Sequence, residues 1–302
     1  SDSVWAELYS ILLQRWDPQD YEVIILDDST TTALPEVVAQ FRDGMVPGLP
    51  IRFVHFDGWR TTERLHIGPN GRRSITWHLN YGLKMARGEI VLLVIGEFLH
   101  IGQTLQEMTA PHGTCHALVY HGCVRDIKKD IVEQREWVAH QDTSYLLDCD
   151  AAWGQWFVHP THTPLHDEFV FSSVRTAQLR GIGGFDEDFL LGIECELGES
   201  YRRMVRLGCE VQYSSAIVGA HIEHERAGRD LERSNYLATR LARRLLDQGC
   251  WEKNPKVKYY RPGTEKRPIR ANRDRVWGTL PPGVEVWSLE DTLRRLPVGV
   301  SS

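Results

Sequence analysis

The sequence lacks the features of several specialised protein classes. No uninterrupted apolar run is longer than Ile90–Ile95, whereas a membrane-spanning helix needs about 18 such residues. None of the six cysteines lies in a Cys-x-x-Cys pair, and they are too sparse for a small disulfide-stapled scaffold. The first residues, Ser-Asp-Ser, include no basic or apolar segment of a signal peptide, although this start could be truncated. We therefore expect no transmembrane segment, reduced thiols and a cytoplasmic location.

The overall composition is that of an ordinary globular protein. Apolar residues make up 42%, aromatic residues 10% and charged residues 25% of the chain, which excludes whole-chain disorder, collagen and coiled coil. No internal repeat or low-complexity tract is visible. At about 150 residues per domain, 302 residues correspond to two small domains or to one large α/β domain with an appendage.

Charge is unevenly distributed along the chain. The net charge is −6, but residues 251–277 contain nine Lys and Arg against three acids, a local +6 that leaves −12 for the remainder. The same segment carries Trp251, Tyr259, Tyr260 and Trp277. Basic and aromatic side chains together suit a nucleic-acid backbone with stackable bases. They suit equally an extended tail that is solvated or docks on the acidic core, or an anionic lipid surface.

Apolar patterning predicts alternating helices and strands, which is typical of an α/β fold. Residues 21–26 (YEVIIL) form a continuous apolar run, as expected of a parallel strand covered on both faces. Residues 89–95 are the most apolar strand, expected at the centre of the sheet, and residues 211–218 are expected to be the last strand. The other predicted strands are 51–56, 117–120, 136–139 and 169–173, and the predicted helices are 4–16, 34–41, 72–86, 174–180, 194–207 and 229–248.

Four segments occur in an order and spacing that resemble one enzyme family. They are YEVIILDDSTT (21–31), NYG through ARGEI (80–90), GIGGFDEDF (181–189) and ECELGESYRRMVRLG (194–208). Together they resemble the inverting family-2 glycosyltransferases of the GT-A fold, over roughly residues 4 to 245. The resemblance implies an α/β fold with a Rossmann-like, mostly parallel sheet flanked by helices, followed by a C-terminal helical and extended basic appendage.

The resemblance also implies a division of the chain. Residues 1–225 would form the GT-A domain, with a nucleotide-binding half at 1–100 and an acceptor half at 101–225, and residues 226–302 the C-terminal helix and the proline-containing basic tail. Members of the family open with a strand directly before a helix like the one predicted at 4–16. This chain starts at the helix, so we expect that the first strand is missing or that another segment replaces it.

The resemblance places nucleotide contacts at the end of the predicted strand 21–26. Asp28 is the first candidate and Asp27 the second, because a carboxylate at a strand's carboxyl end can accept hydrogen bonds from ribose hydroxyls or a base imide. The same residues could instead cap a helix. Arg72 and Arg73, at the start of a predicted helix, could approach the diphosphate or form a solvated basic end.

A divalent metal is the cofactor that the resemblance implies. The family's D-x-D motif, whose acids hold the metal on the donor's diphosphate, is replaced here by Ile95-Gly96-Glu97. Glu97 is therefore predicted as one ligand of Mn²⁺ or Mg²⁺, and His221, which resembles a late histidine of the family, as the other, with His224 as a substitute. The alternative is that Glu97 is a surface acid and His221 a core residue at a strand end.

Inverting transfer needs a base that removes the proton of the acceptor hydroxyl. Alignment of Glu196-Leu197-Gly198 with the family's E-D-x-E-L segment places Glu194 at the catalytic aspartate, with Glu196 as the second candidate and a charge at a helix N-terminus as the alternative. The predicted acceptor contacts are Trp153 and Trp156, through their aromatic faces, and Asp186 and Glu187 in the glycine-rich turn. The two tryptophans could equally cover the end of the sheet.

These residues together predict an inverting glycosyltransferase of the hexosyltransferase type. It would take its sugar from a nucleotide-sugar donor, with UDP as the commonest nucleotide, and transfer it to a hydroxyl of a saccharide or glycan. One alternative acceptor is a hydroxymethylated base in DNA, as in viral DNA glycosyltransferases, bound through the basic tail 251–277. The other alternative is a catalytically inactive protein that binds a nucleotide sugar or a glycan on the same fold, because Ile95 replaces the first acid of the metal motif.

Overall fold

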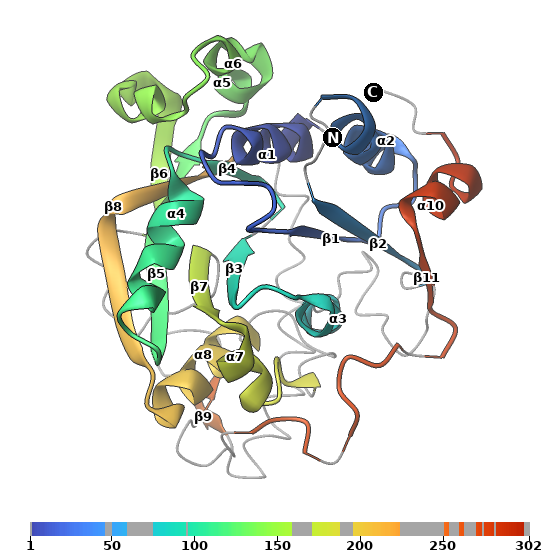
Figure 1. Cartoon of the computed structure of the whole chain (residues 1–302), viewed down its shortest axis with the longest axis vertical. Helices are drawn as coiled ribbons and strands as arrows, with labels where there is room; N and C mark the ends of the chain where they lie inside the picture. The colour runs from blue at the N-terminus through green and yellow to red at the C-terminus, as the bar shows by residue number, and fades with distance from the viewer. Residues whose placement is uncertain are drawn as a thin grey trace.

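Two larger β-sheets with helices packed against them, and a separate two-stranded sheet, are found in the described part of the structure, a computed structural model (Figure 1). It describes residues 2–45, 50–58, 75–94, 96–158, 171–187, 196–223, 251–253, 260–262, 270–273, 275–280 and 282–298. No helix in these ranges is long and apolar enough to cross a membrane.

The smaller sheet combines the N-terminal strands with one strand near the C-terminus. β1 (Val23–Asp27) runs parallel to β2 (Ile51–Asp57), and β11 (Glu285–Trp287) pairs antiparallel with β2. The helices α1 (Asp2–Leu12), α2 (Ala33–Gln40) and α10 (Leu289–Arg295) contribute to its apolar core, whose buried members are Leu8, Ile11, Val38, Phe41 and Leu289. The parallel strand predicted at 21–26 is thus confirmed.

The larger sheet is mixed, so the prediction of a mostly parallel sheet is wrong. Its strand order is β3 (Ile90–Val94), β7 (Phe171–Arg175), β5 (Leu118–Ile127), β8 (Glu210–Ile222) and β4 (Phe98–His100), and β6 (Trp153–Val158) pairs with β5. Among its described strands only β5 and β8 are parallel to each other. Apolar runs could not reveal this, because a strand buried on both faces has the same pattern in either direction.

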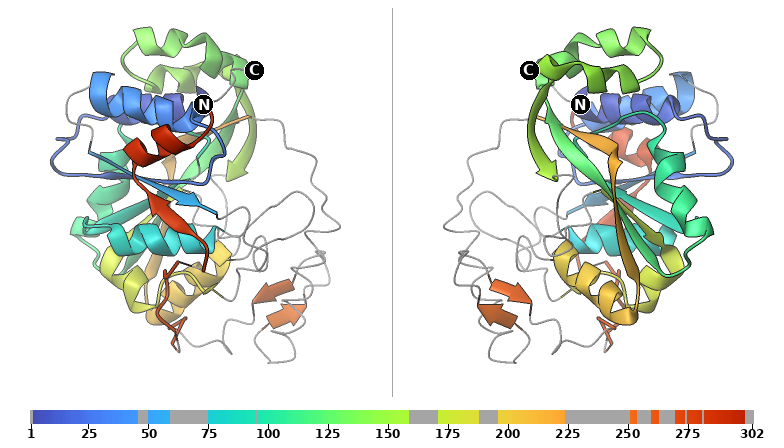
Figure 2. Two further views of the ribbon diagram at one scale, coloured as in Figure 1. Left: turned by 90° about the vertical axis from the view of Figure 1, so that its right-hand side faces the viewer. Right: turned by 90° about the vertical axis from the view of Figure 1, so that its left-hand side faces the viewer.

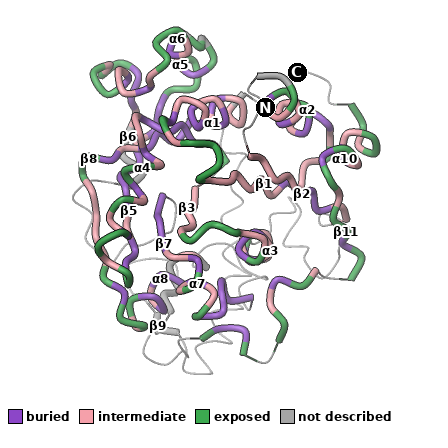
Figure 3. Tube along the Cα trace, in the orientation of Figure 1, coloured by how far each residue is buried: buried purple, intermediate pink, exposed green. Residues whose placement is uncertain are grey.

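β3 lies at the edge of the larger sheet and not at its centre, contrary to prediction. Within the described ranges it pairs with β7 alone. All five side chains of β3 are half-buried, as are those of Val23–Leu26 in β1, and both strands are pink in Figure 3. High apolarity predicts that the faces of a strand are covered, but it does not show whether both edges are paired.

The other α-helices of the described residues and one further pair of strands complete the fold. They are α3 (Thr76–Met85), α4 (Thr104–Thr109), α5 (Lys129–Gln134), α6 (Glu136–Ala139), α7 (Thr176–Gly181), α8 (Glu196–Leu207), and the paired strands β9 (Trp251–Lys253) and β10 (Tyr260–Pro262). The strand predicted at 136–139 is wrong, because these residues form α6. Trp137 is fully buried in one cluster with Val132 and Leu99, and four residues are too few for periodicity to distinguish helix from strand.

We define the C-terminal segment as the described residues between 270 and 298. It belongs to the fold, so the prediction of a C-terminal appendage is wrong. β11 extends the smaller sheet, and α10 packs against α2, as Figure 2 shows. Val284 and Leu289 are buried in two different core clusters. The strand predicted at 211–218 lies within β8 but is not the last strand, because β9, β10 and β11 follow it in the described residues. The helix predicted at 229–248 lies outside the described residues, and the domain boundary at 225 stays a prediction.

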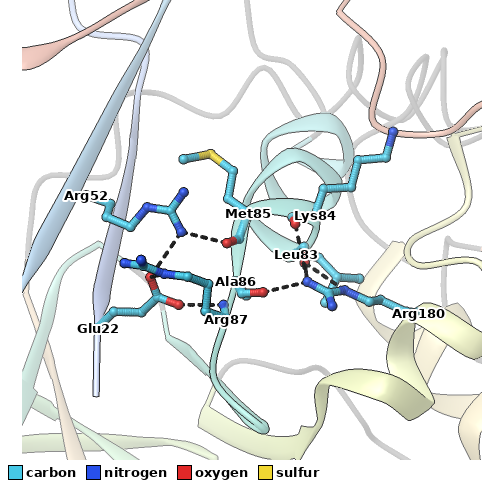
Figure 4. A network of polar contacts seen from close by, with 8 residues as sticks. All are labelled: Glu22, Arg52, Leu83, Lys84, Met85, Ala86, Arg87 and Arg180. Carbon is cyan, nitrogen blue, oxygen red and sulfur yellow. Dashed lines mark hydrogen bonds and ion pairs between the residues drawn. The ribbon is translucent and has the colours of Figure 1, made fainter. Parts of the chain in front are cut away.

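Three charged residues hold the end of α3 between the two sheets (Figure 4). Glu22, before β1, accepts hydrogen bonds from the Arg87 N–H at 2.5 Å and from Arg52 Nη1 at 3.1 Å. Burial alone would raise the pKa of Glu22, but these hydrogen bonds outweigh it and hold the pKa below its ordinary value. Arg180 on α7 donates to the carbonyls of Leu83, Lys84 and Ala86. The NYG-to-ARGEI element is therefore fixed by Glu22 and Arg52 on the side of the smaller sheet and by Arg180 of α7.

Candidate functional site

Asp27, the last residue of β1, is buried and hydrogen-bonded to its own surroundings. Its Oδ2 lies 2.6 Å from Nδ1 of His55, its partner in the β1·β2 register, and both side chains are 2% exposed. The carboxylate also accepts hydrogen bonds from the N–H and the hydroxyl of Ser29 at 3.0 and 2.9 Å. On the far side of His55, the indole of Trp287 in β11 lies 5.3 Å away, centroid to centroid. Asp27 thus holds the turn that follows β1.

Asp28 and Asp57 follow the two parallel strands at the same sheet edge. Asp28 comes directly after β1, Asp57 is the last residue of β2, and both are half-buried. The carboxyl ends of parallel strands are where open α/β sheets bind ligands. Asp28, the first predicted nucleotide contact, therefore lies at a suitable edge, and Asp57 is a second acid there that motif comparison missed, because it belongs to no recognisable motif.

Glu97 and His221, the predicted metal ligands, occupy neighbouring positions in the pairing of β4 with β8. His221 is opposite Phe98, and the Ile222 N–H donates to the Glu97 carbonyl at 2.9 Å. The imidazole Nδ1 of His221 lies 2.8 Å from Oδ1 of Asp126 on β5, and both residues are buried. Asp126 was missed by the sequence analysis, since nothing in the sequence around it indicates which histidine it contacts.

The side chains of Glu97 and His221 suit part of the coordination sphere of a metal ion. A metal-binding histidine commonly has its second ring nitrogen hydrogen-bonded to a carboxylate, which is the relation between His221 and Asp126. Burial and the neighbouring carboxylate of Glu97 raise the pKa of Glu7 on α1 well above its ordinary value, so two acids from different elements lie close together here. Within the described ranges, however, no group of three or more His, Cys, Asp or Glu residues could hold an ion by itself.

The glycine turn (residues 181–187) contains Asp186 and Glu187, which are 4% and 5% exposed. Glu187 Oε1 accepts hydrogen bonds from the Gly278 N–H at 2.5 Å and from Asn80 Nδ2 at 3.1 Å. Asn80, the first residue of the NYG motif, also bonds both the N–H and the carbonyl of Phe185 at 2.8 Å. Two of the four motifs therefore meet in a buried network, in which Glu187 acts as an acceptor for other parts of the chain.

The two predicted aromatic contacts lie on β6. Trp153 is 6% exposed, and its indole N–H donates to the Leu146 carbonyl at 2.6 Å. Its ring contacts the guanidinium of Arg125 at 5.5 Å. The backbone of Trp156 pairs with that of Arg125, and its side chain lies outside what the structure describes. Trp153 is thus a residue of the core, and a contact of either tryptophan with an acceptor stays a prediction.

Several predicted residues lie outside the described ranges. These are Arg72, Arg73, Glu194, His224 and most of the basic tail 251–277. Glu196 is the first residue of α8, but its side chain is not described. The roles predicted for these residues are therefore untested by the geometry.

The smaller sheet has a parallel β1·β2 pair with acids at its carboxyl edge, and the mixed sheet carries Glu97 and His221. This α/β fold matches that of GT-A glycosyltransferases. No protein-family model matches the chain, and no curated protein matches it. Solved structures do match.

Three of these share the fold at low sequence identity. The mannosyltransferase PcManGT from Pyrobaculum calidifontis, in complex with GDP-Man and Mn²⁺, is 17% identical over 84% of this chain, with a TM-score of 0.51. TarS 1–349 from S. aureus, in complex with UDP-GlcNAc, is 17% identical over 82%, also at 0.51. GalNAc-T7 with UDP, GalNAc and Mn²⁺ is 11% identical over 80%, again at 0.51.

The chain spans 62%, 64% and 46% of the lengths of these three proteins, less than two thirds of each. At such identities the similarity shows a common fold, and a common fold does not by itself define an activity. Function must therefore be argued from the residues of the site.

Proposed function

We propose that the chain is a glycosyltransferase that moves a sugar from a nucleotide-sugar donor, UDP-linked, to a hydroxyl of a saccharide with inversion at the anomeric carbon. The observation that carries this proposal is the Asp126–His221 pair beside Glu97, 2.8 Å between Nδ1 and Oδ1, in a fold shared with solved sugar-nucleotide complexes. The resemblance of four ordered motifs to the inverting family supports the stereochemistry.

The nucleotide is bound at the carboxyl edge of β1 in this proposal. Asp28 accepts hydrogen bonds from the ribose or the base, and Arg73 approaches the diphosphate. Asp27 contributes indirectly, because its carboxylate already accepts two hydrogen bonds from Ser29 and contacts His55. It keeps the turn that presents Asp28 in one conformation.

Glu97 and the Nε2 of His221 would hold a Mn²⁺ or Mg²⁺ ion together with the donor's phosphate oxygens. When bound, such an ion neutralises charge on the diphosphate leaving group. Asp126 fixes the ring of His221, since a hydrogen bond at Nδ1 sets both the tautomer and the orientation of the imidazole. Because this proposal assigns two protein ligands from the described residues, metal and nucleotide should bind together rather than separately.

Glu194 is the proposed base, removing the proton of the acceptor hydroxyl as its oxygen attacks. Asp186, Trp153 and Trp156 are the proposed acceptor contacts. Glu187 serves the acceptor through the shape of the glycine turn, because both described hydrogen bonds of its carboxylate are made within the protein.

Turnover of sugar nucleotides tests the proposal. The protein is incubated with UDP-GlcNAc, other UDP-sugars and GDP-mannose in the presence of Mn²⁺, with an oligosaccharide panel in one arm and hydroxymethylated DNA in another. We expect transfer to a saccharide, and a loss of about 100-fold or more in Glu194→Gln, with UDP affinity by calorimetry unchanged. Glu133→Gln, an exposed acid on α5, is the control.

Three outcomes would contradict the proposal or one of its parts. Binding of UDP with no turnover under either metal would indicate a binding protein on the same fold. Full activity of Glu194→Gln would assign the base to another residue, and Glu196→Gln is then the next variant to measure. Transfer to DNA alone would exclude a saccharide as the acceptor.

A further inference from the structure

The backbone of the glycine turn is held by side chains that come from distant parts of the chain. Arg203 on α8 is 2% exposed and donates to the carbonyls of Ile182 and Gly184 at 2.6 and 2.7 Å. Asn80 on α3 bonds both backbone groups of Phe185. A buried turn must pair its backbone groups somewhere, and here most of the partners are side chains.

Asn272 in the C-terminal segment supplies three of these hydrogen bonds. Its Oδ1 accepts from the Glu187 N–H at 3.1 Å, and its Nδ2 donates to the carbonyls of Gly183 and Phe185 at 2.8 and 2.9 Å. The residue is 9% exposed and has a φ of 53°. Asparagine is one of the few residues that tolerate this left-handed conformation, so side chain and backbone both suit the position.

The C-terminal segment lies directly against the turn at this point. The Ala271 N–H donates to the Ile182 carbonyl at 2.8 Å. A Cβ atom on Gly183 would lie 2.3 Å from the Ala271 carbonyl oxygen, and the φ of Gly183 is +82°. Glycine is thus required there for two independent reasons, the approach of another backbone and the conformation.

The same segment then continues along α3 to the smaller sheet. The Gly278 N–H donates to Glu187, and the ring of Trp277 lies 5.3 Å from Nζ of Lys84. Leu280 and Val284 pack in one cluster with residues of β2 and α3, before β11 joins the edge of β2. The C-terminal segment therefore contacts the glycine turn at one end and the smaller sheet at the other.

We propose that Asn272 is a positioning residue that sets the conformation of the glycine turn and thereby the placement of Asp186 toward the acceptor. The acceptor role of the turn rests on the proposed function, whereas the anchoring rests on the hydrogen bonds alone. Loss of the three bonds would leave two carbonyls and one N–H of the turn without these partners, and the turn would relax. The predicted donor site uses other elements, β1 and the β4·β8 pair, so it should be unaffected.

Two substitutions at this position separate the effects. Asn272→Gly keeps a backbone that accepts a φ of 53° but removes all three hydrogen bonds. Asn272→Asp keeps the acceptor for the Glu187 N–H and loses both donors. Thr279→Ala, at an exposed residue of the same segment whose described hydroxyl hydrogen bond is to the Val276 carbonyl, is the matched control. Hydrogen exchange of the Glu187 amide and the Michaelis constants for donor and acceptor are measured in each.

We expect the Glu187 amide to exchange about tenfold faster or more in Asn272→Gly, as the loss of one net hydrogen bond implies, and to stay protected in Asn272→Asp and in the control. The KM for the saccharide that the wild type uses should rise about fivefold or more in both Asn272 variants, while the KM for the sugar nucleotide and its hydrolysis without acceptor stay within about twofold.

Unchanged exchange in Asn272→Gly would overturn the anchoring. Faster exchange with an unchanged acceptor KM, or an equal rise in both Michaelis constants, would overturn the positioning role. A wild-type protein that neither binds nor turns over any sugar nucleotide would instead refute the proposed function and with it the effect on the acceptor. The exchange comparison would still decide whether Asn272 holds the turn.

Discussion

Replacing two buried histidines of the larger sheet by glutamine should reduce the sensitivity of the fold to mild acid. His100 on β4 is 1% exposed and lies 2.8 Å from the hydroxyl of Thr104; His121 on β5 is 3% exposed and lies 2.6 Å from the hydroxyl of Ser172. Burial lowers the pKa of each imidazole from 6.5 to about 3. In the unfolded chain each regains its ordinary pKa.

The sign follows from proton binding in the two states. Between pH 6 and 4 the unfolded state binds protons at these residues and the folded state does not, so stability is fully present above pH 6.5 and falls as the pH is lowered toward 3. At pH 5.0 each histidine lowers the free energy of unfolding by about 2 kcal/mol relative to pH 7.5. This figure depends little on the folded pKa, because the folded imidazole is neutral at pH 5 for any pKa below about 4.

Other groups titrate in the same range, so the test compares variants with the wild type. The raised pKa of Glu7 acts in the opposite direction, since the folded state then takes up a proton that the unfolded state still lacks. The lowered pKa of Glu22 acts in the same direction as the histidines, but mainly below pH 5. Both contributions are common to all the variants and cancel in the comparison.

Urea unfolding at pH 7.5 and 5.0 measures the effect. The wild type should lose about 4 kcal/mol more between these pH values than the double variant His100→Gln/His121→Gln, and about 2 kcal/mol more than either single variant. Any pH-independent cost of a substitution cancels in the difference. His140→Gln, at an exposed position, should behave as the wild type. If the double variant keeps the full pH dependence, the histidines are not neutral in the folded protein and the reasoning fails.

Three further predictions concern single contacts. Asp126→Asn should weaken Mn²⁺-dependent sugar-nucleotide binding about tenfold because it changes the group that orients His221, and an unchanged Mn²⁺ titration would contradict this. Gly219→Ala should lower the free energy of unfolding by about 3 kcal/mol, since its Cβ would lie 1.9 Å from the ring of Phe98. Urea unfolding should show that adding Phe98→Leu restores part of this lost free energy. Arg180→Met should lose about 2–3 kcal/mol in the same assay, because three carbonyls at the end of α3 lose their cationic donor; a loss below about 0.5 kcal/mol would show that water replaces it.

The elements near the N-terminus could be predicted from the sequence because their patterns are local. The strands expected at 21–26, 51–56 and 89–95 appear as β1, β2 and β3 with ends shifted by two residues at most. The helices expected at 34–41 and 72–86 appear as α2 and α3 over the described residues. Apolar run length and flanking turn residues are sufficient for this, since they depend on neighbours in the chain.

Sheet architecture could not be predicted in the same way. Strand direction and edge position depend on which strands meet, and the pairing of β3 with β7 joins residues about eighty positions apart. β11 was missed for a related reason. Its three residues follow a segment rich in proline and charge, and only the pairing with β2 reveals that Val286 and Trp287 belong to a strand.

The site shows the same division between local and distant information. The motifs identified Asp28, Glu97 and His221 as candidates, but the partner of His221 lies on another strand, 95 residues away. Asn272 belongs to no motif, and its hydrogen bonds to the glycine turn span up to 89 residues. Such partners are defined by register and packing, which a single sequence does not encode in any short pattern.

In both acidic pairs of the motifs, one of the two acids holds a turn through its own hydrogen bonds. Asp27 is bonded to Ser29 and His55, and Glu187 to Gly278 and Asn80. A carboxylate whose lone pairs are used in this way contributes preorganisation, because it keeps its neighbour from relaxing when a charged ligand arrives. Asp28 and Asp186, which the motifs already identified as candidates for the nucleotide and the acceptor, are the members to test for contact with donor and acceptor. Under the proposed function, Asp27 and Glu187 hold their turns, while Asp28 and Asp186 would contact the donor and the acceptor.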